Sequence, residues 1–114
     1  MGWSLLMLTL MACGGSNDQY RAWLNQPQKH DLWLVETDDA EFPYQLWRVD
    51  SVKNGTVYYA ASNTQFHREE GFDGDVAASR VWVQGYFKAA LAQPISIEGS
   101  LLMLEARQIK KVYR

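Results

Sequence analysis

The amino-acid sequence predicts an α+β fold that is mostly β, either a small curved antiparallel sheet or an SH3-like barrel of four to five strands, with one short C-terminal helix. Three observations carry this prediction. Asn54-Gly55 lies between two strand-like segments and predicts a tight hairpin. Residues 31–36 form a short apolar run between polar neighbours, which is typical of a strand buried on both faces. Ser96 precedes apolar residues at helical spacing and predicts the start of a helix.

The composition suits one folded domain and excludes several classes of protein. The chain has 114 residues, of which 47% are hydrophobic and 21% are charged, so it can bury one modest core. The formal net charge is −2, and no stripe of Lys and Arg is interleaved with aromatic residues, so nucleic acid is not an expected partner. The single cysteine excludes an intrachain disulfide.

Residues 1–12 differ from the rest of the chain, because every charged residue lies after Cys13. An apolar run of this length is too short to cross a bilayer as a helix, which takes about 20 residues, and it fits the apolar region of a signal peptide. Residues 14–19 are glycine and polar residues, which predicts a flexible linker. We therefore expect a signal peptide over 1–12, Cys13 and a linker over 13–30, and one globular β-rich domain over 31–114.

The junction Leu10-Met11-Ala12-Cys13 resembles the lipobox of bacterial lipoproteins, which has Leu, a tolerant position, a small residue and then Cys. The resemblance implies cleavage after Ala12 and lipid on Cys13, which attaches the mature chain to a membrane. Gly14 implies the outer membrane of the bacterial cell envelope, with the domain facing the periplasm. The chain departs from the family pattern in having no Lys or Arg before the apolar run. The alternative is an unpaired Cys13 buried on an ordinary N-terminal helix.

The hairpin is expected to have strands over 45–52 and 56–61. Its two-residue turn fixes a register in which Val52 opposes Val57, Asp50 opposes Tyr59, and Trp47 opposes Ser62. One face, expected to meet the core, then carries Trp47, Val49, Tyr58 and Ala60. Arg48 and Asp50 point to the other side.

The segments around the hairpin complete the predicted fold. An acidic loop over 37–41 is closed by Pro43, and residues 62–79 are rich in Gly, Asp and Ser, which predicts a long loop. Residues 80–88 alternate well enough to form a further strand, with Gly85 at a bend. Pro94 is expected to end regular secondary structure at that point. Residues 109–114 can close the sheet as an edge strand, where Lys side chains discourage aggregation.

The sequence contains no pattern that predicts a catalytic residue, a metal site or a cofactor. His30 and His67 have no partner at zinc-type spacing and are expected to be solvated loop residues. The segment 73–75 begins like a calcium loop, but the positions that follow do not continue the ligand series. No nucleophile-elbow or phosphate-loop motif is present.

Two clusters of charge remain as candidate binding features. The acidic cluster is the candidate for contact with a partner and consists of Glu36, Asp38, Asp39 and Glu41. The basic end consists of Arg107, Lys110, Lys111 and Arg114. They are either two solvated segments that lie near each other or, where bordered by an exposed Trp or Tyr, a surface for another protein.

These features predict a lipid-anchored envelope protein that acts as a non-catalytic binding module, similar in layout to small periplasmic lipoproteins. In a more specific version it is an immunity-type inhibitor of a toxin, which rests on size and export alone. The alternative is a structural accessory subunit of an outer-membrane or envelope complex. A small hydrolase ranks last. The expected partners are the membrane, through Cys13, and a protein that the sequence does not identify.

Overall fold

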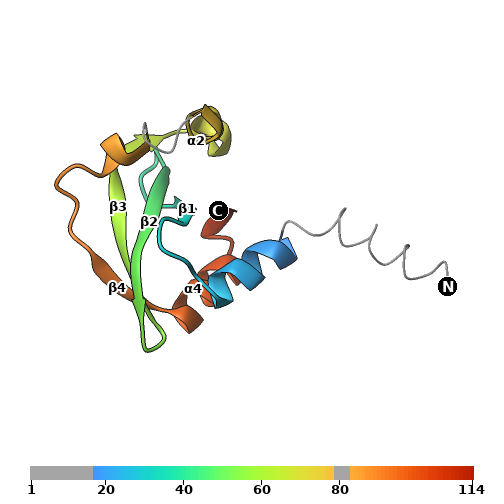
Figure 1. Ribbon diagram of the computed structural model, residues 1–114. Coiled ribbons are helices and arrows are strands. Elements are labelled where there is room, and N and C mark those ends of the chain that lie inside the picture. Colours follow the sequence, from blue (N-terminus) through green and yellow to red (C-terminus); the bar gives the residue numbers. More distant parts are fainter. Residues whose placement is uncertain (1–16, 79–82) are drawn as a thin grey trace.

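The computed structural model describes residues 17–78 and 83–114 (Figure 1). The elements follow in the order of a helix over residues 17–25, β1 Leu32–Glu36, β2 Tyr44–Lys53, β3 Thr56–Phe66, η1 Glu69–Phe72, α2 Asp73–Ala78, η2 Gly85–Phe87, β4 Gln93–Ser96, α4 Ile97–Glu105 and β5 Ile109–Tyr113. The elements η1 and η2 are short 3-10 helices.

The five strands form one sheet in the order β4-β3-β2-β1-β5, and each neighbouring pair is antiparallel. The strands β4 and β5 are the two edges and do not pair with each other, so the sheet is open. The predicted α+β, mostly β class is therefore confirmed in its open-sheet form, with α4 as the short C-terminal helix, and the SH3-like barrel is wrong.

The central part of β1 is buried on both faces, as the sequence predicts. Trp33 and Val35 belong to one apolar cluster, which also includes Leu24 of the first helix and Leu104 of α4. Leu32 and Leu34 point the other way into a second cluster, built with residues of β2, β3, η1 and η2. Figure 1 shows the first helix and α4 side by side, with α2 away from both. The sheet is thus the middle layer between two helical covers.

The tight hairpin is confirmed at its turn. Asn54 and Gly55 have φ values of 51° and 78°, the two positive values that a type I′ turn requires. Val52 pairs with Val57 as predicted. Beyond that point the register shifts between Val49 and Ser51 and again between Gln45 and Trp47, and such bulges place extra residues in one strand.

The shifted register corrects the predicted pairs and the predicted core face. Tyr59 pairs with Val49 instead of Asp50, and Trp47 pairs with Ala61 instead of Ser62. The ring that stacks on Trp47 is accordingly Tyr59, at 4.1 Å between centroids, and not Tyr58. Ala60 lies in the second cluster, on the opposite face from Trp47 and Val49. Arg48 does point to that opposite side, where it lies over the Phe87 ring.

The predictions for residues 62–88 are mostly wrong. β3 continues to Phe66, and the expected loop contains η1 and α2. The expected strand over 80–88 ends in the helical turn η2, and residues 79–82 lie outside the described part of the chain. The reason is tertiary packing, because Phe72, Val83 and Phe87 are buried against the second face of the sheet. The burial of these side chains outweighs the weak alternation of apolar and polar residues that predicted a strand.

The C-terminal elements form largely as predicted. The Ser96 side chain caps α4 by accepting a hydrogen bond from the Gly99 N–H at 2.9 Å, and β5 is an edge strand. The strand β4 was not predicted, because it contains Pro94. Proline has no N–H to donate, but an edge strand tolerates that loss.

The predicted linker does not hold for residues 17–25, which form a helix. Leu24 is fully buried, and Tyr20 and Trp23 pack against the same cluster. Their spacing at i, i+3 and i+4 gives one apolar helix face, which the polar composition of residues 14–19 obscured. The packed domain therefore includes residues before 31. Cys13 and the predicted cleavage signal lie outside the described residues.

Candidate binding site

Most of the basic end is bound within the molecule. Lys110 pairs with Glu36 of the acidic cluster at 3.2 Å, because β5 and β1 are neighbouring strands. Lys111 pairs with Asp73 at 2.8 Å, and Arg114 pairs with Asp31 at 2.7 Å. These charges have structural partners and leave little of the basic end available as a binding surface.

The pair of Arg114 and Asp31 connects the end of the first helix to the start of β1. Asp31 is only 2% exposed, and its two carboxylate oxygens accept from Arg114 Nε at 3.1 Å and Nη2 at 2.7 Å. The Gln28 N–H also donates to this carboxylate, at 2.9 Å. Arg114 Nη2 donates in addition to the Gln26 carbonyl, at 3.0 Å. The cluster holds the first helix against the sheet.

Asp73 fixes the start of α2 to β5 in a similar way. Its carboxylate accepts from Lys111 Nζ and from the Tyr113 hydroxyl. Burial opposes ionisation of Asp73, but the hydrogen bonds from Lys111 and Tyr113 outweigh it and lower the pKa of the carboxyl. Burial, followed by the hydrogen bond to Asp73, raises the pKa of Tyr113. The contacts of Asp73 with Lys111 and Tyr113 thus hold the start of α2 beside β5.

The acidic loop between β1 and β2 is held in one shape by its own backbone. Asp39 Oδ1 accepts from the N–H groups of Glu41 at 2.9 Å and Phe42 at 2.8 Å, and these bonds lower the pKa of Asp39. The Thr37 N–H donates to the Pro43 carbonyl at 2.6 Å and closes the neck of the loop. Asp38, Asp39 and Glu41 are exposed. Within the acidic cluster, Glu36 is therefore paired with Lys110, and the other three carboxylates are exposed.

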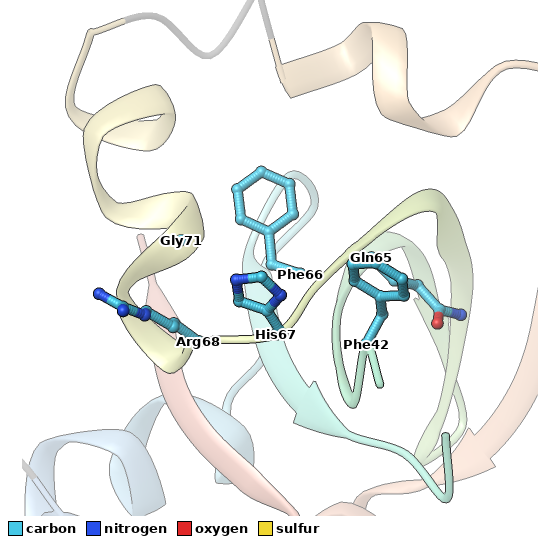
Figure 2. Close-up of a pocket in the computed structure, with 6 residues that line it drawn as sticks. All are labelled: Phe42, Gln65, Phe66, His67, Arg68 and Gly71. Carbon is cyan, nitrogen blue, oxygen red and sulfur yellow. The ribbon is translucent and has the colours of Figure 1, made fainter. Parts of the chain in front are cut away.

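A hollow of about 280 Å³ lies where this loop meets the end of β3 and the start of η1. It is lined by Phe42, Gln65, Phe66, His67, Arg68 and Gly71 (Figure 2). Phe42 is 41% exposed, and its ring stacks on His67 with centroids 5.6 Å apart. Phe66 stacks at 4.0 Å on the buried Phe72 and joins the hollow to the core. We name this feature the Phe42 hollow.

Sequence reasoning found the acidic loop but not the hollow beside it. The expected aromatic border was an exposed Trp or Tyr, yet Trp33 is fully buried. The aromatic residue at the loop is Phe42, and His67, expected to be a solvated loop residue, forms one wall of the hollow. The two walls are about 25 residues apart in the chain, and no local pattern shows that they meet.

Gly71 lines the hollow where the backbone lies close to the Phe66 side chain. A Cβ at Gly71 would lie 1.9 Å from Phe66 Cδ2 and 2.7 Å from Phe66 Cγ, whereas a Cβ at Gly74 would meet nothing within 4 Å. We expect Gly71→Ala to displace the Phe66 ring and to lower the free energy of unfolding by about 1–3 kcal/mol. Gly74→Ala, also helical, should raise that free energy by up to about 1 kcal/mol. Urea denaturation measures both, and equal stability of the two variants would contradict this account.

In the part of the chain that the structure describes, no three His, Cys, Asp or Glu side chains are grouped so as to hold a metal ion. The helices among these residues are each too short or too polar to cross a membrane. Comparison of the chain with protein-family models, with curated proteins and with solved structures finds no match.

Proposed function

We propose that this chain is a lipid-anchored envelope protein whose folded domain is a non-catalytic binding module, and that the Phe42 hollow receives a side chain of a partner protein. The observation that carries the proposal is the hollow itself, with an exposed aromatic ring at its mouth and exposed carboxylates on the adjoining loop. An apolar pocket with a charged rim is the arrangement in which anchor residues of protein interfaces bind.

The size and rigidity of the hollow support this function. Its volume of about 280 Å³ lies near the lower end of the range of about 300–1,000 Å³ that is usual for small-molecule sites, and is enough for one large side chain. The hydrogen bonds that Asp39 makes within the loop hold Phe42 in place before any partner arrives. A preorganised loop loses less conformational entropy on binding.

The chemistry of the lining favours binding over catalysis. The six lining residues include no Ser, Thr, Cys or Lys that could act as a nucleophile. His67 is the one histidine in the lining, and its ring is stacked on Phe42.

The proposed anchor rests on the lipobox-like junction at residues 10–13. The described helix begins at residue 17, and four residues span at most about 14 Å even when fully extended. Lipid on Cys13 would therefore hold the domain close to the membrane surface. Such tethering raises the local concentration of the hollow for any partner in the same membrane or complex.

Site-specific photo-cross-linking tests the function. The photoreactive residue p-benzoylphenylalanine replaces Phe42 in the full chain, which is expressed in the cells that naturally make it. The matched control carries the same residue in place of Leu102, which is 64% exposed on α4. We expect one discrete protein adduct from position 42 and none of the same mass from position 102.

The identity of the adduct then separates the two versions of the proposal. A toxin encoded beside this chain would indicate an immunity protein, and a resident envelope component would indicate an accessory subunit. The absence of any adduct at position 42, or the same adducts at both positions, would contradict a binding role for the Phe42 hollow.

A further inference from the structure

We infer that the partner segment bound at the Phe42 hollow is cationic, with an apolar anchor side chain flanked by Lys or Arg. This inference rests on the proposed function and specifies its partner. It is carried by the balance of charge on the two segments that wall the hollow and by the way in which the other charges of the domain are neutralised.

The two segments that wall the hollow carry more acidic than basic residues, while the one charged residue in the lining itself is Arg68. The loop that presents Phe42 carries three exposed carboxylates, Asp38, Asp39 and Glu41. The opposite wall continues into η1, whose first turn contains Glu69 and Glu70. Against these five carboxylates the same segments carry one arginine, Arg68, which is exposed.

This excess of negative charge is local. Several carboxylates elsewhere in the described residues are matched by bases, as in the pairs of Glu36 with Lys110, Asp73 with Lys111, Asp50 with Arg48 and Asp31 with Arg114. Asp38 and Glu41 have no such ion pair among the described residues, although several basic side chains lie within the same small domain. The fold thus leaves unneutralised carboxylates beside its apolar hollow.

An apolar hollow with an anionic rim selects its occupant by chemistry. The rings of Phe66 inside the hollow and Phe42 at its mouth would exclude water from a bound apolar side chain, and a neighbouring Lys or Arg would approach Asp38 and Glu41 on the adjoining loop. Such rim charges chiefly increase the association rate and reject partners of like charge. An acidic segment would approach a part of the surface that carries more carboxylates than bases, so the charge balance disfavours it.

The experiment combines the position-42 cross-linker with charge reversal in the full chain. The variants are Glu41→Lys and the double variant Asp38→Lys, Glu41→Lys. Glu98→Lys is the matched control, because Glu98 is also exposed but lies in the first turn of α4. These side chains are on the surface, so each variant is expected to fold. Asp39 is left unchanged because it holds the loop.

We expect the adduct yield to fall several-fold in Glu41→Lys and by about tenfold or more in the double variant, with no change in Glu98→Lys. Sequencing of the adduct should find Lys or Arg within a few residues of the cross-linked position. An adduct of undiminished yield in the double variant, or a linked segment rich in Asp and Glu, would overturn the cationic partner but leave the binding role intact. Absence of an adduct before any charge is changed would instead count against the binding role itself.

Discussion

Replacing Asp31 by alanine is expected to lower the free energy of unfolding by about 3–5 kcal/mol. The change removes the buried carboxylate that pairs with the Arg114 guanidinium and accepts from the Gln28 N–H. A domain of this size is stable by only about 5–15 kcal/mol, so the variant should be partly unfolded at moderate urea concentration. Urea denaturation followed by tryptophan fluorescence measures the loss.

The control for this prediction is Glu105→Ala. Glu105 also pairs with an arginine, Arg21, at 3.2 Å, but both side chains are about half exposed, and such surface pairs contribute at most about 1 kcal/mol. Arg114→Ala should approach the loss of Asp31→Ala, and the double variant should lose less than the sum because both residues belong to one cluster. If Asp31→Ala is no less stable than Glu105→Ala, the buried pair does not hold the first helix in place.

Replacing Cys13 by serine is expected to abolish metabolic lipid labelling and to move the chain from the membrane fraction to the soluble fraction of the envelope. A serine hydroxyl does not replace the thiol in lipid attachment, and each acyl CH₂ buried in the bilayer contributes about 0.8 kcal/mol. Losing two or three chains is therefore close to an all-or-none change. Fractionation of cells fed with a labelled fatty acid measures both effects.

The matched control at the junction is Met11→Ala. Alanine is usual at this tolerant position of a lipobox, so the variant should keep its label and its membrane attachment. A Cys13→Ser chain that stays on the membrane and is processed at the normal rate would contradict the proposed anchor.

Elements specified by short-range chemistry were predictable from the sequence. Asn54-Gly55 formed its turn because few other dipeptides adopt positive φ at both positions. Ser96 formed the predicted cap because its hydroxyl reaches a backbone N–H three residues on. The apolar run over 32–35 predicted a strand covered on both faces, and it is.

Elements specified by distant contacts were not predictable. The elements η1, α2 and η2 are helical because Phe72 and Phe87 pack against the second face of the sheet, and no local pattern in the sequence shows that packing. The bulges in β2 and β3 moved Tyr59, rather than Tyr58, onto Trp47. A single inserted residue reverses every side chain beyond it.

The same division applies to the candidate site. The acidic loop was visible in the sequence as four carboxylates in six residues, but the loss of Glu36 to Lys110 depends on the pairing of β1 with β5. The Phe42 hollow depends on the position where β3 ends and η1 begins. Its lining residues are of common types, so the site can be recognised only from their proximity in the folded chain.

The ratio of cross-linked adduct from position 42 to that from position 102 tests the central claim most directly. The binding role predicts a discrete adduct at the mouth of the Phe42 hollow and none of that mass from the exposed face of α4, although Leu102 is the more exposed of the two residues. Equal yields of the same adduct from both positions, or no adduct from position 42, would contradict it.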